Sequence, residues 1–237
     1  MTHKIFLSPP YHRWNPCAIE GCDETTHNNK YLDILQKYLE FNGFEIMRGA
    51  RRTPKSSEDG TQLMYKAVED SNKWGAELHY ISHTNAYDGN VKGYRPMYYT
   101  DSAKGYKLCK ILCEHRKGIY KHNISPRSNN VLYELKETKC PAIYEEHVFH
   151  DNIEDAQYFH DNMYLIAQET CKGICEYFKV KYKEPFFYTA VDSLKAMQIS
   201  VGKLKNNDMY QWRYDLDGDG KISANDALLI LQRAVGK

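Results

Sequence analysis

The sequence predicts an α/β fold, in which a twisted, mostly parallel sheet is flanked by helices, followed by a small all-α module. Two observations support this prediction. Short runs rich in branched and aromatic residues alternate with longer stretches of helical periodicity, which is typical of a parallel sheet covered by helices. The composition then changes after a short basic linker at Lys179–Pro185. We therefore divide the 237-residue chain into a domain at residues 1–179 and a module at residues 180–237.

The domain begins with a strand and a helix. Lys4–Ser8 is an apolar run that ends at two prolines, which cannot continue a β-ladder. Asp23 and the residues after it open a helix with apolar positions at helical spacing, and Asn42–Gly43 ends it. Phe44–Met47 is a second strand. The polar segment Arg51–Gly60 is then a loop that we expect to border a functional site.

The central strand is Leu78–Ala86, which is rich in branched and aromatic residues and follows a helix at Thr61–Trp74. The later elements follow from the same patterns and support a sheet whose strands alternate with helices. They are a strand at Arg95–Thr100, a helix at Ser102–Lys117, a break at Arg127–Asn130 before the segment Val131–Leu135, a strand at Ala142–Glu146, and helices at Asn152–His160 and Asn162–Phe178.

Charge and hydropathy exclude several classes of partner. The formal net charge is +1, so the chain lacks the strong field that nucleic acids or anionic membranes select. No run approaches the ~18 consecutive apolar residues of a membrane span. The N-terminus carries no signal-peptide pattern and begins a strand at once, so we expect synthesis in the cytoplasm and another exit route to any place of action outside the cell.

Cysteine and tyrosine usage add two expectations. The seven cysteines include the pairs Cys109/Cys113 and Cys171/Cys175, each spaced four apart on a predicted helix. This spacing places two thiols on one helix face and cross-links nothing distant, so we predict buried, reduced thiols instead of a disulfide framework. Twenty tyrosines suit a groove that binds sugars or peptides by flat contact, and they equally suit half-exposed sheet faces.

Polar residues near the ends of three elements indicate a metal site. Side chains alternate along a strand, and His83 arrives at the carboxyl end of the central strand, where open α/β sheets hold ligands. His12 follows the first strand, and Glu24 lies near the first turn of the first helix. Two imidazoles and a carboxylate with an open fourth position form a ligand set used for catalytic zinc. A core histidine bonded to backbone is the competing interpretation of His83, and spacing alone leaves rival ligands at His27, His79, His147 and His150.

A general base is expected at the end of a neighbouring strand. Glu145 and Glu146 are adjacent at the end of Ala142–Glu146. Because successive side chains face opposite sides of a sheet, only one of the two can face the site, and we assign Glu146 to it. A solvated pair of glutamates is the competing interpretation.

Four ordered stretches resemble the zinc-dependent N-acetylmuramoyl-L-alanine amidases, many of which are phage endolysins or bacterial autolysins. Glu77–Ala86 is similar to the family's strand that ends in His-x-Asn-Ala, and Glu24–Asn28 is similar to its Glu-x-x-x-Asn helix start. Ile5–Pro9 with His12 resembles the opening strand and the first histidine ligand. Pro141–Glu146 resembles the segment that carries the catalytic glutamate.

The resemblance covers about residues 4–178 and implies a zinc enzyme that cuts the amide between the lactyl group of N-acetylmuramic acid and L-alanine in peptidoglycan. It implies zinc ligands at His12, Glu24 and His83 and a catalytic base at Glu146. The lack of a signal peptide suits an endolysin that a phage holin releases to the cell wall. The alternatives are a zinc peptidase acting on the stem peptide and a non-catalytic wall-binding or scaffold protein. Candidate rim groups are Asn85, Arg127 and Asn129.

The C-terminal module contains a calcium-loop pattern. Acidic residues occupy positions 1, 3, 5 and 12 of the loop, and glycine occupies position 6 for the turn. Oxygen ligands at this spacing wrap Ca²⁺, with a backbone carbonyl at position 7 and a hydroxyl or its water at position 9. The predicted ligands are Asp215, Asp217, Asp219, the Lys221 carbonyl, Ser223 and Asp226.

The aspartate at position 12 and the single following helix, Ala227–Val235, resemble dockerin modules. That resemblance implies a duplicated repeat, and Asp192–Lys203 repeats as Asp226–Lys237 at an offset of 34. The first copy has lysines and a proline where the acids would fall, so we expect one structural calcium ion. The module is expected either to bind a cohesin-like or cell-wall partner or to act as a calcium-stabilised clamp on the catalytic domain.

Overall fold

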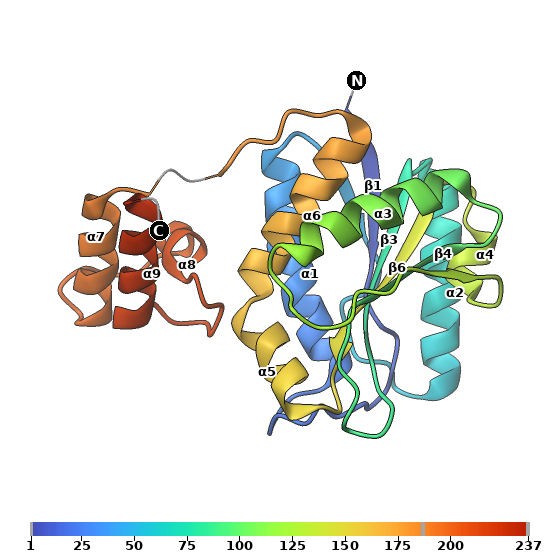
Figure 1. The fold of residues 1–237 in the computed structure, drawn as a ribbon, viewed down its shortest axis with the longest axis horizontal. Helices are drawn as coiled ribbons and strands as arrows, with labels where there is room; N and C mark the ends of the chain where they lie inside the picture. The colour runs from blue at the N-terminus through green and yellow to red at the C-terminus, as the bar shows by residue number, and fades with distance from the viewer. Residues whose placement is uncertain (1, 186–187, 236–237) are drawn as a thin grey trace.

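A computed structural model of the protein describes residues 2–185 and 188–235. The larger domain contains a six-stranded sheet with the strand order β2-β1-β3-β6-β4-β5 (Figure 1). The first four strands in this order run parallel, and β4 is antiparallel to β6, which confirms the predicted mostly parallel sheet. The strands are β1 (Lys4–Ser8), β2 (Glu45–Arg48), β3 (Leu78–Asn85), β4 (Arg95–Tyr99), β5 (Arg127–Asn129) and β6 (Ala142–Phe149).

Helices cover both faces of the sheet (Figure 1). On one face, the apolar side chains of the helices pack against alternate strand residues such as Leu78, Tyr80 and Ile143 to form the main core. On the other face, a smaller cluster joins Ile81 to Leu135. The main-core face carries α1 (Glu24–Phe41), α3 (Ala103–Lys117), α5 (Ile153–Asp161) and α6 (Met163–Phe178), and the other face carries α2 (Ser57–Trp74) and α4 (Tyr133–Glu137).

Two predicted elements of the larger domain differ from the structure by three or more residues at one end. The helix predicted at Thr61–Trp74 begins four residues earlier, because the Ser56 side chain caps it by accepting from the Asp59 N–H. It ends as predicted at Gly75, whose φ of 73° places it in the left-handed region that favours glycine. The strand predicted at Ala142–Glu146 continues three residues further, to Phe149.

The prediction of a break at Arg127–Asn130 was wrong. Arg127–Asn129 forms the short edge strand β5, and the chain turns after it because the Asn129 side chain accepts hydrogen bonds from the N–H groups of Val131 and Leu132. This Asx turn leads directly into α4. Val131 and Leu132 therefore lie in a turn, and Val131 is exposed.

The C-terminal module consists of three short helices around a small core of its own (Figure 1). The repeat predicted from sequence reappears in three dimensions, because Thr189 with Asp192 and Ser223 with Asp226 form capping boxes at the offset of 34 residues. The last two residues of the second copy, Gly236 and Lys237, lie outside the described residues. The helices are α7 (Ala190–Ser200), α8 (Asp208–Tyr214) and α9 (Ala224–Ala234).

The cysteines confirm one expectation and correct another. The four cysteines paired at helical spacing are buried and free, as predicted. Cys17 and Cys22, however, form a disulfide in the loop before α1. The prediction considered only pairs on helices, and this pair lies in a loop whose closure does not show in the sequence. Within residues 2–185 and 188–235, no helix is long and apolar enough to cross a bilayer.

Candidate metal centre

The structure brings His12, Glu24 and His83 together at the carboxyl end of the parallel strands. One ligand atom from each of the three residues lies within 4.8 Å of the others. The Nε2 of His12 is 3.4 Å from one Glu24 oxygen, and the Nδ1 of His83 is 2.9 Å from the other. Three residues that are far apart in sequence thus aim two nitrogens and one carboxylate at a common point.

Local structure fixes the carboxylate of Glu24. Asp23 caps α1, which places Glu24 in its first turn at 1% exposure. Its oxygens accept from the Asn15 amide and from the Thr84 N–H, at 2.7 and 3.0 Å. Burial alone would raise the pKa of Glu24, but His83 and the Thr84 N–H outweigh it and lower the pKa to about 2. Glu24 is therefore an ionised acceptor.

His12 provides the open side of the centre. Its side chain is 48% exposed, whereas that of His83 is 8% exposed. Burial is the main factor that lowers the pKa of His12, and Glu24 only partly opposes it. The ring is therefore neutral near pH 7 and keeps an unprotonated nitrogen for a metal.

Glu146 lies on the strand next to His83. The two residues are register partners in the parallel pair β3 and β6, so their side chains share a sheet face. Burial raises the pKa of Glu146 to about 7, while His83 and Arg95 oppose the rise. The Asn85 amide donates a hydrogen bond to the carboxylate. A carboxyl group with this pKa is about half ionised at pH 7, and this one lies beside His83.

Glu145 points to the opposite face, as the strand alternation predicted. It is fully buried and accepts hydrogen bonds from the hydroxyls of Tyr80 and Tyr94. Burial raises its pKa, and the charge of Arg116 opposes the rise. Glu145 therefore belongs to a closed polar network within the main core and does not face the metal centre.

The structure gives each rival histidine other partners. His79 shares the face of His83 but lies nearer the start of β3, where its Nε2 is 2.9 Å from a Glu134 oxygen. His147 faces the main core and bonds to Ser82 and Arg116. His150 bonds to Thr84, and His27 lies beside the disulfide. His12, Glu24 and His83 are thus the predicted ligands that converge at this end of the sheet.

A cavity of about 370 Å³ opens beside the metal centre. His12 and His83 line one end of it, and the start of α2 lines another part, so the segment after Arg51 does border the site as expected. The ring of Tyr144 stacks on His83 with centroids 4.4 Å apart. The remaining lining residues include Tyr11, Arg13, Met64, Leu132, Tyr133 and Glu134.

Among the residues that sequence reasoning missed, two lie next to His83 and Glu146. Tyr144 lies two positions before Glu146, so the period of two along β6 was a signal that could have found it. Arg95 pairs with Glu146 in the antiparallel register of β4 and β6, which the sequence does not reveal. Of the predicted rim groups, Asn85 contacts Glu146, whereas Arg127 and Asn129 lie on the edge strand β5.

The acidic loop of the C-terminal module brings together three of its predicted ligands. Oxygens of Asp215, Asp217 and Asp219 lie within 4.8 Å of one another. Burial, followed by the neighbouring acids, raises the pKa of Asp215 to about 7. Asp226 is fully buried, and its oxygens accept from backbone N–H groups, including those of Leu216 and Ser223. The exposed Lys221 donates its N–H to Asp219.

Comparisons with known proteins identify relatives of the larger domain. A sequence profile described as N-acetylmuramoyl-L-alanine amidase matches residues 5–176. An uncharacterized protein of Clostridium perfringens (strain 13 / Type A) is 27% identical over 148 residues. The match covers 61% of this chain and 43% of the relative, so the chain spans less than half the length of the curated relative it matches.

Solved structures share the fold of the larger domain. The CwlD amidase from Clostridioides difficile, in complex with the GerS lipoprotein, aligns with a TM-score of 0.65 at 20% identity over 76% of this chain and 100% of that chain. The catalytic domain of the CD27L endolysin targeting Clostridia Difficile aligns with a TM-score of 0.62 at 20% identity over 73% of this chain and 97% of that chain. At these identities the likeness concerns the fold.

Proposed function

This chain belongs to the N-acetylmuramoyl-L-alanine amidase family, and we propose that it is a zinc-dependent hydrolase that cleaves the amide between the lactyl group of N-acetylmuramic acid and L-alanine in peptidoglycan. The observation that carries the proposal is the convergence of His12, Glu24 and His83 beside Glu146 at one end of the sheet. On this proposal, the protein acts at the bacterial cell wall.

The donor set fits zinc. Two imidazole nitrogens and one carboxylate oxygen are ligands that zinc accepts, and they leave a fourth position for water or substrate. The neutral ring of His12 and the ionised carboxylate of Glu24 are already in the protonation states that metal binding requires. When bound there, zinc supplies a Lewis acid that polarises a carbonyl and lowers the pKa of water.

Glu146 is proposed to hold and move the proton. A pKa of about 7 suits a group that must first accept a proton and then donate it near neutral pH. In this role the carboxylate takes a proton from the attacking water and passes it to the leaving amine of L-alanine. The hydrogen bond from Asn85 would keep the carboxylate turned toward the reacting atoms.

The cavity supports a substrate that combines sugar and peptide. Its volume of about 370 Å³ and its mixture of aromatic and polar side chains match the requirements of an amphipathic ligand. Tyr133 and Tyr144 offer flat apolar surface, while Arg13 offers a positive charge to a carboxylate of the stem peptide. The cavity adjoins His83, so a bound amide would lie next to the metal centre.

The test is a digest of purified peptidoglycan by the zinc-loaded full chain, followed by mass analysis of the products. Amidase cleavage should release stem peptides with a free L-alanine amino group and leave lactyl carboxylates on the glycan. Protein whose zinc has been removed with a chelator is the matched control, and added zinc should restore the release of stem peptides. Cuts within the stem peptide would instead support a zinc peptidase, and an inactive zinc-loaded protein would favour a wall-binding or scaffold role.

For the C-terminal module we propose one structural calcium ion in the loop that starts at Asp215. The proposal is supported by three carboxylates held close together at calcium-loop spacing. A bound divalent cation would relieve the repulsion that contributes to the raised pKa of Asp215. Calcium titration of the full chain should show one binding event that Asp217→Asn weakens. The proposed partner of the module is a cohesin-like or cell-wall component.

A further inference from the structure

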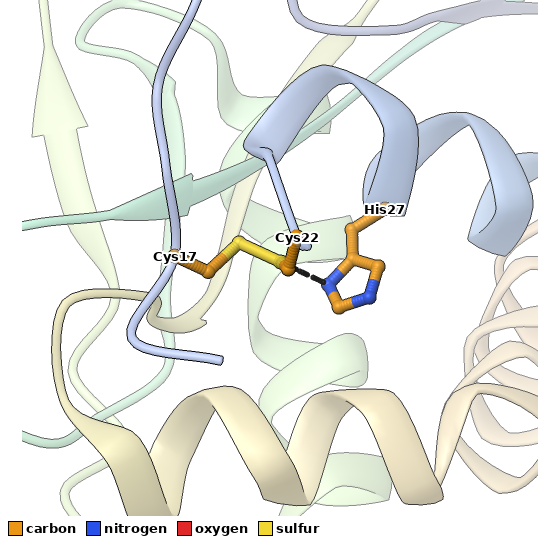
Figure 2. A group of neighbouring side chains, drawn as sticks. All are labelled: Cys17, Cys22 and His27. Atoms are coloured by element: carbon orange, nitrogen blue, oxygen red, sulfur yellow. Dashed lines mark hydrogen bonds between the residues drawn. A yellow bond between two sulfur atoms is a disulfide. The ribbon is translucent and has the colours of Figure 1, made fainter. Parts of the chain in front are cut away.

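A second group of metal-binding side chains lies in the loop before α1. The sulfurs of Cys17 and Cys22 and the Nδ1 of His27 all lie within 4.8 Å of one another (Figure 2). His27 Nδ1 is 2.9 Å from the Cys22 sulfur and 4.0 Å from the Cys17 sulfur. In the structure the two sulfurs form a disulfide, and the imidazole points at it from the first turns of the helix.

The backbone holds the two cysteines together independently of the disulfide. The Cys17 N–H donates to the Cys22 carbonyl at 3.1 Å, and Pro16 and Asp23 form an antiparallel bridge just outside this pair. The Cα atoms of the cysteines are 5.3 Å apart. The Ala18 N–H also donates to the His150 carbonyl, which ties the loop to the end of β6. Reduced thiols would therefore remain neighbours.

His27 is arranged as a neutral ligand. Its Nε2 is 3.1 Å from Nδ1 of His160, so an Nε2–H that donates to His160 leaves Nδ1 unprotonated and aimed at the sulfurs.

We propose that Cys17, Cys22 and His27 form a second metal site, for a thiophilic divalent cation such as Zn²⁺, that becomes available when the disulfide is reduced. A dithiol reductant transfers two electrons to the disulfide, becomes a disulfide itself and leaves two thiols. Binding of the cation then releases two thiol protons to water. Two thiolates and one imidazole are three zinc ligands, and the half-exposed Cys17 side leaves room for water as the fourth.

The proposed site would hold the loop between Asn15 and Glu24 in place in either redox state. The Asn15 carbonyl accepts from the Glu24 N–H, and the Asn15 amide donates to the Glu24 carboxylate. The loop closed by Cys17 and Cys22 lies between these two residues. A disulfide under oxidising conditions and a cation under reducing conditions would close the same loop, so Asn15 would stay against Glu24.

Metal content of the full chain tests the proposal. The protein is prepared oxidised, and also reduced with a phosphine, which does not compete for zinc as a thiol would. After exposure to zinc and gel filtration, the reduced protein should hold about one equivalent more than the oxidised protein. His27→Gln and the double variant Cys17→Ser with Cys22→Ser should lose this difference. Cys140→Ser, which changes a free cysteine outside the group, should keep it.

Cobalt(II) separates this site from the proposed catalytic centre. A thiolate ligand gives cobalt a near-ultraviolet charge-transfer band, and the set of His12, Glu24 and His83 contains no sulfur. The band should appear in reduced wild-type protein, persist in His83→Ala and be absent from oxidised protein. No band and no extra zinc in the reduced wild-type protein would overturn the proposal. A band of full strength in the double cysteine variant would also overturn it, by assigning the signal to other thiols.

Discussion

Glu145 and Glu146 are identical residues, adjacent in sequence, in two opposite environments. Glu145 faces the main core, where two tyrosine hydroxyls donate to it and Arg116 supplies a nearby charge. Glu146 lies on the face of the candidate metal centre, beside His83, is only partly buried and has the Asn85 amide as its hydrogen-bond donor. One carboxyl group is satisfied within a closed network, and the other lies beside His83 near the end of the central strand.

This difference shows that the role of each glutamate depends on the sheet face that it occupies and not on its residue type. Alternation along β6 sends one side chain to each face, and the helices on the main-core face close over Glu145. On the other face, the apolar cluster does not include Glu146, which lies beside His83. A closed polar network stabilises the fold, whereas a carboxyl group with a raised pKa and an open side is available for proton transfer.

The largest expected effect comes from Glu146→Gln. Glutamine keeps the shape and can still bond to Asn85, but it cannot accept a proton. We expect amidase activity to fall by about 10²–10⁴-fold, while zinc content and the unfolding midpoint stay close to wild type. Activity is measured on purified peptidoglycan with protein of known zinc content. Unchanged activity would show that Glu146 does not transfer the proton. The proposed difference in function between Glu145 and Glu146 would then be wrong.

The next effect in size is on stability, in Glu145→Gln. Glutamine keeps only one acceptor oxygen for the two tyrosine hydroxyls, so one buried hydroxyl loses its acceptor, and we expect the free energy of unfolding to fall by about 1–3 kcal/mol. Urea unfolding measures the change, and Glu146→Gln is the matched control, with a change of less than about 1 kcal/mol. Activity per folded molecule should remain. A stable but inactive Glu145→Gln would reverse the assignment of the two glutamates.

A smaller effect is expected from Asn85→Ala. The Asn85 amide is the hydrogen-bond donor that the structure gives Glu146, and its loss removes a bond to a charged acceptor, worth about 1.5 kcal/mol or about tenfold in rate. The loss should appear in kcat with zinc content unchanged. Asn129→Ala, on the edge strand, is the control and should leave kcat unchanged because its side chain serves the turn after β5.

The sequence predicts the parts of this comparison that depend on local pattern. Alternation within β6 separates Glu145 from Glu146. The helix start at Glu24 and the end of the central strand at His83 bring two of the proposed ligands to the same end of the sheet. The turn at Asn129 was missed because a single side chain creates it. Arg95 was missed because its closeness to Glu146 depends on an antiparallel register between distant segments. The Cys17–Cys22 pair was missed because a loop, not a helix, brings it together.

The smallest expected effect concerns pH and comes from Arg95→Gln. Burial raises the pKa of Glu146 to about 7, and the positive charge of Arg95 opposes that rise. The base must be ionised to act, so activity should increase with pH as Glu146 loses its proton. Removing the charge raises the pKa further, so the rising limb should move to higher pH, with a loss of less than about tenfold at pH 7.

Two variants are controls. Arg95→Lys keeps the charge and should leave the rising limb at the wild-type pH. Arg127→Gln removes an exposed charge from the edge strand and should also leave the limb unchanged. The measurement is the pH profile of kcat/KM for all four proteins, on one substrate preparation. If Arg95→Gln and Arg95→Lys moved the limb equally, the cause would be lost packing on Phe149, over whose ring the guanidinium lies at 4.5 Å, and not lost charge. Arg95 would then have no part in opposing the effect of burial on the pKa of Glu146, which differs from Glu145, where the charge of Arg116 and two tyrosine hydroxyls oppose that effect.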